Sequence, residues 1–107
     1  AQKMIVGIGR IKPGMGHTRH NHEDSEEFIY FMEGKAHQTI ERPDGLQERD
    51  MGPGELIYIP QGAFHSTMNI GDEDLVFMCC YLNAGSELAI EKAALEIIPP
   101  KNNWKDE

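Results

Sequence analysis

The chain has 107 residues, which is enough for one domain and too few for two independent cores. Apolar residues make up 39% and the charged residues are spread along the chain, a composition that favours a folded globular protein over a disordered one. The formal net charge is -8 and the lysine and arginine residues form no cluster. We therefore expect no nucleic-acid partner, because phosphate backbones would be repelled.

The sequence also bears on the compartment. No apolar run approaches the roughly 20 residues that span a bilayer, and the N-terminal residues lack the charged-then-apolar pattern of a secretory signal. Cys79 and Cys80 are adjacent, and neighbours on a strand point to opposite faces, so a disulfide between them is geometrically poor. We expect a soluble, cytoplasmic protein with reduced thiols and no membrane partner.

β-Branched residues and turn signals indicate three strands at the start of the chain. Residues 4–11 are rich in isoleucine, valine and glycine, and Pro13-Gly14 then predicts a turn. Residues 17–22 form the next expected strand. An acidic turn follows, and residues 27–32 have the composition of a third strand.

The rest of the chain predicts further short strands and one helix. Residues 35–41 and 47–51 can pair as a hairpin, because Pro43-Asp44-Gly45 lies between them. Three further strands are expected, and they cover residues 56–59, 64–69 and 75–82. Residues 86–97 look helical, with Ser86 as N-cap and Pro99-Pro100 as the stop.

Eight or nine short strands at intervals of about ten residues predict an all-β sandwich or barrel. We expect one domain over residues 1–107, with the barrel at about 4–82 and a short C-terminal helix and tail at 83–107.

Histidines and one glutamate form the main candidate site. His20 and His22 are separated by one residue, which on a strand aims both imidazoles at the same face. An antiparallel return could bring Glu27 beside them, and closure of a barrel could add His65. Three nitrogens and one carboxylate oxygen would then hold a divalent metal and leave positions open for water or substrate.

Two spacing patterns support this grouping. The first is G-x5-H-x-H-x4-E-x6-G and the second is G-x5-P-x-G-x2-H-x3-N. Their ten specified positions make coincidence negligible, because each amino acid is used at a few per cent. They are filled by Gly14, His20, His22, Glu27, Gly34, Gly54, Pro60, Gly62, His65 and Asn69.

These patterns resemble the two motifs of the cupin superfamily, and the resemblance spans about residues 4–82. It implies a double-stranded β-helix, or jelly roll, with the metal inside the barrel and His20, His22, Glu27 and His65 as its ligands. The first cupin motif allows three or four residues before the glutamate, so Glu26 is a formal rival to Glu27, but the six-residue step to Gly34 selects Glu27. Asn69 is expected to bond local backbone.

Other residues yield weaker expectations. We expect a largely apolar substrate pocket formed by Ile29, Phe31, Ile57, Phe64, Met68 and Tyr81. Strand parity predicts that His17 faces away from His20, and both His17 and His37 are expected at the surface. Phe28, Tyr30 and Met32 alternate with Glu27 and should point outward. Such a stripe favours a homodimer, with burial under the C-terminal helix as the alternative.

We expect a metal-dependent enzyme that acts on a small, weakly charged, oxygen-bearing molecule, of dioxygenase, isomerase, decarboxylase or lyase type. An oxidoreductase is one member of that range. A non-catalytic sensor or ligand-binding module is the alternative, and a purely structural metal is a third reading. The ligand set accepts Fe, Mn, Co, Ni, Cu or Zn, so the sequence does not select the metal.

Overall fold

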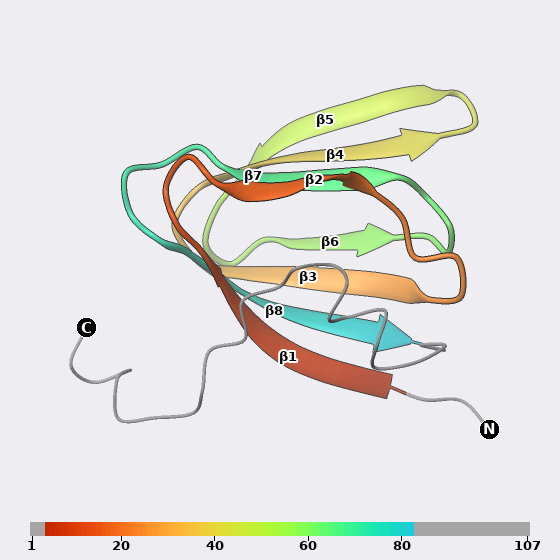
Figure 1. Ribbon diagram of the computed structural model, residues 1–107, viewed down its shortest axis with the longest axis horizontal. Coiled ribbons are helices and arrows are strands. Elements are labelled where there is room, and N and C mark those ends of the chain that lie inside the picture. Colours follow the sequence, from red (N-terminus) through yellow and green to blue (C-terminus); the bar gives the residue numbers. More distant parts are fainter. Residues whose placement is uncertain (1–3, 83–107) are drawn as a thin grey trace.

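The computed structural model describes residues 4–82, which form eight strands in two four-stranded antiparallel sheets (Figure 1). One sheet has the order β1-β8-β3-β6 and the other has the order β2-β7-β4-β5, the arrangement of a jelly roll. The strands are β1 (Met4–Ile11), β2 (Gly16–His20), β3 (Glu26–Glu33), β4 (Ala36–Arg42), β5 (Gly45–Met51), β6 (Leu56–Ile59), β7 (His65–Asn69) and β8 (Leu75–Leu82).

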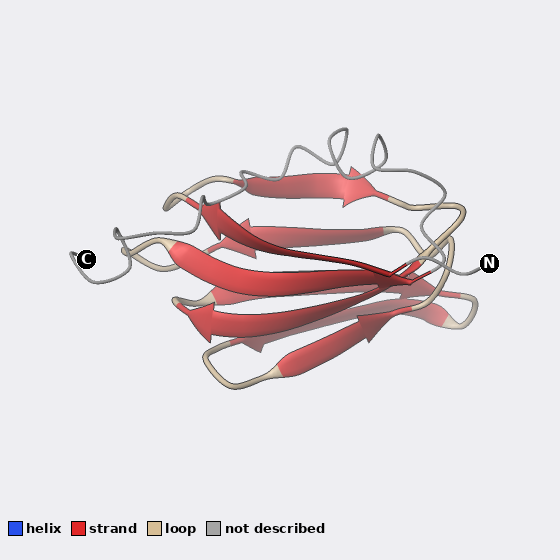
Figure 2. Cartoon of the chain, turned by 90° about the horizontal axis from the view of Figure 1, so that it is seen from below, coloured by secondary structure: helices blue, strands red, loops and turns tan. Residues whose placement is uncertain are grey.

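The expected all-β architecture is confirmed (Figure 2). β1, β6 and β8 have the predicted bounds, and the predicted hairpin is formed by β4 and β5. The strand expected over residues 17–22 is wrong at its end, because β2 stops at His20 and His22 lies in the following loop. The helix expected over residues 86–97 lies outside the described residues. No helix within residues 4–82 is long and apolar enough to cross a membrane.

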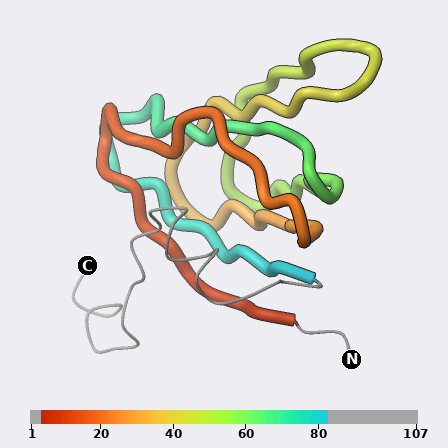
Figure 3. Tube along the Cα trace, turned by 45° about the vertical axis from the view of Figure 1, so that its right-hand side comes forward, coloured from red at the N-terminus to blue at the C-terminus, as the bar shows by residue number. Residues whose placement is uncertain are grey.

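The two sheets curve around a common interior (Figure 3). Phe31 and Phe77 lie opposite each other on β3 and β8 and are fully buried. A Cβ atom on Gly9 would stand 2.6 Å from the Phe77 ring, so glycine at this position of β1 lets the ring fill the core. Apolar packing therefore fills the part of the barrel next to these residues, and it closes the interior to water there.

Gly34 joins β3 to β4 in a conformation that requires glycine. Its φ is 91°, and a Cβ atom there would lie 2.8 Å from the Asp74 carbonyl oxygen. Both the positive φ and the close backbone approach exclude a side chain. This glycine of the first motif therefore acts in the fold and not in the chemistry.

Asn69, the last residue of the second motif, connects the end of β1 to the β7–β8 loop through its buried side chain. Its Nδ2 donates to the Ile11 carbonyl at 2.9 Å and to the Glu73 carbonyl at 2.8 Å, and its Oδ1 accepts from the Gly71 amide at 2.8 Å. The expectation that Asn69 bonds local backbone is confirmed. The contacts tie the end of β1 to the loop between β7 and β8.

We expect Asn69→Ala to lower the free energy of unfolding by about 2–4 kcal/mol, because it leaves buried carbonyl and amide groups unpaired. Urea denaturation of the metal-free protein measures this loss. Asn21→Ala is the control, since Asn21 donates one part-buried bond to the Gly62 carbonyl at 3.2 Å. Equal losses in the two variants would show that the link from Asn69 between β1 and the β7–β8 loop adds no more stability than one part-buried hydrogen bond.

Candidate metal centre

Three histidines from two segments of the chain meet inside the barrel. His20 ends β2 and His65 begins β7, and the two residues are direct register partners with ring centroids 4.3 Å apart. His22 follows in the loop, with its ring 5.1 Å from that of His20 and 5.5 Å from that of His65. One ring nitrogen of each histidine lies within 4.8 Å of the others, so the group could hold a metal ion.

A β-bulge in β2 aims His20 into the barrel. His17 pairs with Thr67 and His20 pairs with His65, so three steps on β2 match two steps on β7. The extra residue reverses the strand alternation, and His17 and His20 therefore face the same side. The parity prediction for His17 is wrong for this reason. Its ring lies 5.9 Å from His20 and 6.4 Å from Phe77, beside the histidine cluster.

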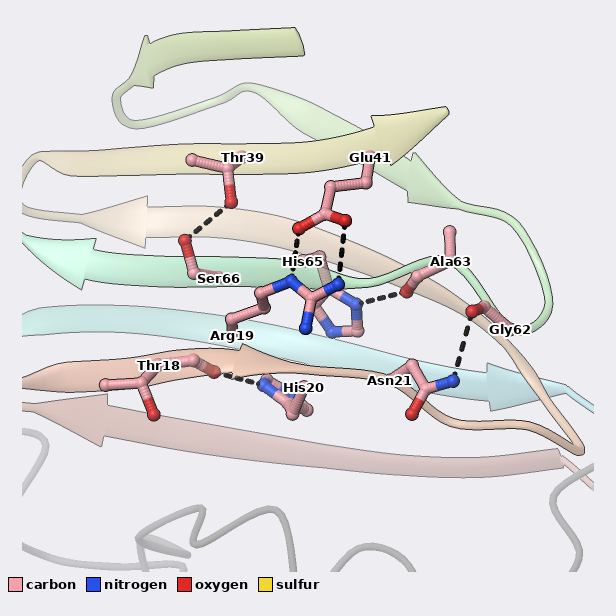
Figure 4. Close-up of polar contacts among 10 residues, drawn as sticks. All are labelled: Thr18, Arg19, His20, Asn21, Thr39, Glu41, Gly62, Ala63, His65 and Ser66. Carbon is pink, nitrogen blue, oxygen red and sulfur yellow. Dashed lines mark hydrogen bonds and ion pairs between the residues drawn. The ribbon is translucent and has the colours of Figure 1, made fainter. Parts of the chain in front are cut away.

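Backbone carbonyls fix the orientation of two of the imidazoles (Figure 4). The Nδ1 of His20 lies 2.6 Å from the Thr18 carbonyl oxygen, and the Nδ1 of His65 lies 2.9 Å from the Ala63 carbonyl oxygen. A carbonyl oxygen can only accept, so Nδ1 carries the proton in both rings. The Nε2 atoms are left with lone pairs, as metal-binding imidazoles require.

Glu27 on β3 lies next to two of these histidines. Its Oε1 lies 3.3 Å from the Nε2 of His65 and 3.6 Å from the Nε2 of His22. Two ligand atoms about 2.1 Å from one ion at a tetrahedral angle are roughly 3.4 Å apart, so these separations suit a shared ion. Glu26 is not in this group, because it lies one residue out of phase and only partly buried.

Two of these atoms have no hydrogen-bond partner among the described residues. The Nε2 of His22 and the Oε1 of Glu27 are both buried and unpaired, although they point toward the same place. Unpaired buried polar atoms are costly and need an explanation. A cation between them would satisfy both, so the donor set fits a divalent metal.

Burial favours the neutral forms of His20 and His22. It lowers the pKa of His22 to about 4 against the opposing effect of Glu27, and it also lowers the pKa of His20. Neutral imidazole is the form that binds metals, so the His22 nitrogen is available well below neutral pH.

Tyr81 on β8 supports the carboxylate. It is the register partner of Glu27, and its ring packs edge-on against the His22 ring at a centroid distance of 5.0 Å. Its hydroxyl interacts with the Glu27 carboxylate and with the Cys79 thiol. Burial raises the pKa of Tyr81 far above its ordinary value and that of Cys79 to about 12, so both groups keep their protons.

The expected pocket residues divide into three groups. Ile29 and Phe31 are buried core residues, and Tyr81 lies beside the histidines. Ile57 lines a cavity of about 640 Å³ between β5 and β6.

The pocket prediction is wrong for Phe64 and Met68. Met68 alternates with His65 and Thr67 along β7 and therefore faces the outer side of its sheet. Phe64 lies one residue before His65. The exposed guanidinium of Arg19 stacks over the Phe64 ring, with the Arg19 Cζ atom 3.9 Å from the ring centroid. Arg19 itself forms an ion pair with Glu41 on that outer surface (Figure 4).

His37 lies on the outer surface, as expected. It contacts Asp50 and Glu48 on β5 at 2.9 Å each, and these carboxylates raise its pKa. It therefore serves as an internal contrast to His22.

A comparison with family models finds that the cupin domain matches residues 7–81. The chain belongs to the cupin domain family. This match covers the strands that position all four candidate ligands, and it confirms the resemblance found in the two motifs.

Curated relatives of this cupin domain include enzymes of different reaction types. It is 35% identical to oxalate decarboxylase OxdC of Bacillus subtilis over 64% of this chain and 18% of that protein. It is also 35% identical to glucose-6-phosphate isomerase of Thermococcus kodakarensis over 58% of this chain and 33% of that protein. The chain thus spans a third or less of the length of these relatives.

Solved structures give the same answer for the fold. A Bacillus subtilis oxalate decarboxylase structure, described for its Mn(II) centres, superimposes with a TM-score of 0.71 and 27% sequence identity. The match covers 78% of this chain and 22% of that one. The jelly-roll expectation is thereby confirmed.

In metal-free protein, we expect His22 to reduce stability as the pH falls from about 6.5 to about 4. In the unfolded state His22 takes up a proton near pH 6.5, whereas in the folded state its pKa is about 4. Between these two values protonation stabilises the unfolded state more than the folded state. His22→Gln should therefore show a shallower loss of unfolding free energy in urea titrations with a chelator present.

His37→Gln should behave oppositely. The pKa of His37 is raised, so its contribution is fully present below about 6.5 and is lost as the pH rises through the folded value. The stability loss in this variant should be largest in acid. Identical pH profiles for the two variants would contradict the assigned environments.

We expect Tyr81→Phe to weaken metal affinity by about 10–100-fold, the usual effect of losing a group that holds a metal ligand. The variant keeps the ring beside His22 and removes only the hydroxyl at Glu27. Competition titration with a chromogenic chelator measures the change. Tyr30→Phe is the matched control, because Tyr30 lies on the opposite face of the same sheet. Unchanged affinity in Tyr81→Phe would remove Tyr81 from the centre.

Proposed function

We propose that this cupin domain is a metal-dependent enzyme that holds one divalent transition metal through His20, His22, Glu27 and His65. The observation that carries the proposal is the pair of buried, unpartnered atoms, His22 Nε2 and Glu27 Oε1, beside two other imidazoles. Several metals suit this donor set. Mn(II) is the first candidate, because the similar oxalate decarboxylase has Mn(II) centres.

The exposure of the ligands supports a reactive centre over a purely structural one. His22, His65 and Glu27 are almost fully buried, whereas His20 is only partly buried. The group is therefore most exposed at His20. Structural metal sites are usually closed by protein ligands on all sides. When bound, the metal supplies a Lewis acid that polarises an oxygen of the substrate.

The surrounding residues favour a small substrate. Among the described residues, the buried polar groups include histidine, serine, glutamate, glutamine, threonine and asparagine but no lysine or arginine. A sugar phosphate needs fixed cations for its phosphate, and residues 4–82 bury no lysine or arginine. A small carboxylate or other oxygen-bearing molecule can have its charge balanced at the metal. This reasoning favours a decarboxylase-like or dioxygenase-like substrate over that of the isomerase relatives.

The chain's own residues would orient the metal ligands and hold a proton beside them. The carbonyls of Thr18 and Ala63 hold the His20 and His65 rings in place, and Tyr81 holds Glu27. Tyr81 keeps its proton on the phenol oxygen, so it can donate a hydrogen bond without changing the charge of the centre. His17 stands beside His20, where it could contact a ligand that enters from the accessible side.

We expect the wild-type chain, purified without a metal-affinity column, to contain one divalent metal per chain. Chelation should abolish turnover of a small carboxylate panel that includes oxalate, and adding Mn(II) or Fe(II) should restore it. His65→Ala should lower metal affinity by more than ~100-fold, because it removes a ligand and not only a supporting group. Elemental analysis and product assays measure both effects. His37→Ala, which lies on the outer surface, should retain metal and activity.

Two results would overturn parts of this proposal. Full metal content in His65→Ala would remove that residue from the centre. Tight binding of a panel molecule without turnover, in metal-loaded protein under air, would favour the non-catalytic ligand-binding module instead of the enzyme.

A further inference from the structure

The cavity of about 640 Å³ opens between β5 and β6, which are edge strands of the two sheets. Within residues 4–82, β5 pairs only with β4 and β6 pairs only with β3, so no backbone ladder closes the seam between them. The β4–β5 hairpin also projects from the body of the barrel (Figure 3). We call this space the β5–β6 cavity. Its volume lies in the usual range for a site that holds a small organic molecule.

The floor of the β5–β6 cavity is apolar. Ile40 on β4, Met51 at the end of β5 and Ile57 on β6 line it, and the first two are buried. Leu46 and Leu56 line it from β5 and β6, with 56% and 58% of their surface exposed. The apolar body of a ligand placed here would remove exposed leucine surface from water, which is a main driving force of binding.

Two arginines bring positive charge to this cavity. Arg42 follows Gln38 and Ile40 on the inner face of β4, and Arg49 on β5 is the register partner of Gln38. Both arginines line the cavity. The chain has four arginines and a formal net charge of -8, so half of its arginines surround one cavity of an acidic protein. This arrangement favours a ligand that carries a negative charge.

Arg42 is the better anchor for an anion. Arg49 forms an ion pair with Glu55, with 3.0 Å between the Arg49 Nη2 and the Glu55 Oε2. Arg42 instead donates from its Nε to the neutral Gln47 Oε1 at 2.8 Å. That bond orients the Arg42 guanidinium without cancelling its charge. Its two Nη groups can then hold a carboxylate through parallel N–H bonds.

The acidic groups near the cavity are engaged elsewhere. Glu48 contacts the His37 Nε2 at 2.9 Å, and Glu26 interacts with the Tyr58 hydroxyl. Among the described residues, no carboxylate forms an ion pair with Arg42. An incoming anion would therefore meet Arg42 without displacing a carboxylate of the chain.

Gln38 marks the inner end of the cavity. Its buried amide accepts from the Thr67 hydroxyl and donates to the Thr39 carbonyl at 3.2 Å. Gln38 lies four residues before Arg42 on β4, so their Cα atoms are about 14 Å apart. Ile40 lies between these two polar positions. The distance suits a ligand with a charged head at Arg42 and an apolar body of several carbons.

The β5–β6 cavity is separate from the candidate metal centre. Its lining includes none of the four candidate ligands. Ile40 is the register partner of His65, and β4 lies between β7 and β5 in the sheet. The buried Ile40 side chain therefore stands between the His65 ring and the cavity. Occupation of the cavity should not require a metal.

We infer that the β5–β6 cavity is a second ligand site, which binds a medium-chain monocarboxylate. The carboxylate lies on Arg42, and the apolar body lies over Ile40, Met51 and Ile57. The site does not depend on the proposed enzymatic activity, because none of its residues holds the metal.

Isothermal titration of the full chain with octanoate, in the presence of a chelator, tests this inference. The dissociation constant should be on the order of 0.1–1 mM, as expected for a ligand of this size. Butanoate and hexanoate should bind more weakly, by about three- to fourfold for each methylene removed. Octan-1-ol has the same apolar body without the charge, and it should bind at least about tenfold more weakly than octanoate.

Arg42→Gln and Arg19→Gln form a matched pair. Arg19 lies on the outer surface in its ion pair with Glu41, away from the cavity. Arg42→Gln should weaken octanoate binding by about 10–100-fold and leave octan-1-ol binding unchanged, because it removes only the charged anchor. Arg19→Gln should leave both affinities unchanged. Circular dichroism shows that the two variants are folded.

His65→Ala separates this site from the metal centre. Octanoate affinity should stay within about twofold of the wild type in this variant, and also when Mn(II) is added to the wild-type chain, since Ile40 separates the two sites. Loss of metal from His65→Ala with unchanged octanoate binding would support two independent sites. Failure of the proposed enzyme activity would leave this result unaffected.

Three outcomes would overturn the inference. Absence of octanoate binding at millimolar concentration would leave the cavity without this class of ligand. Binding that is lost on chelation or in His65→Ala would place the carboxylate on the metal. Equal weakening by Arg42→Gln and Arg19→Gln would show a non-specific attraction between the anion and surface arginines.

Discussion

The structure of this cupin domain depends on two buried polar atoms that have no partner among the described residues. Burying the Nε2 of His22 and the Oε1 of Glu27 without hydrogen bonds costs free energy that the barrel does not recover from protein contacts. A divalent cation shared between them, as we propose, would satisfy both atoms and would join the segment that contains His20, His22 and Glu27 to the distant His65. On this proposal, metal binding would compensate the local cost and link stability to function.

Strand alternation places the candidate site residues and the outer-surface residues on opposite faces of the same sheet. On β3, Glu27 faces the interior while Phe28 faces the outer side, and on β8 the same relation holds for Tyr81 and Cys80. One sheet therefore presents a candidate metal ligand and its supporting tyrosine on its inner face and apolar side chains on its outer face. Substitutions on the outer face should leave the centre undisturbed, because the two sets of side chains point in opposite directions.

Membership of the cupin domain family defines the framework and leaves the reaction open. The relatives include a decarboxylase and an isomerase, and the match covers only 18% and 33% of their respective lengths. The same ligands can serve different reactions, since the outcome depends on what the surrounding residues bind and protonate. In this chain those surroundings include Tyr81 and His17, and no lysine or arginine is buried among residues 4–82.

The sequence alone was sufficient to predict the all-β barrel, most strand positions and the grouping of the three histidines, because turn residues and motif spacing are local signals. It also predicted the outward apolar stripe on β3, since alternation depends only on residue parity. The parity argument failed for His17, because the extra residue in β2 turns its ring toward His20. Parity holds along β7, where it would have placed Met68 on the face opposite to His65. A bulge arises from the register between strands distant in sequence, so only the folded structure could determine which side chains surround the centre.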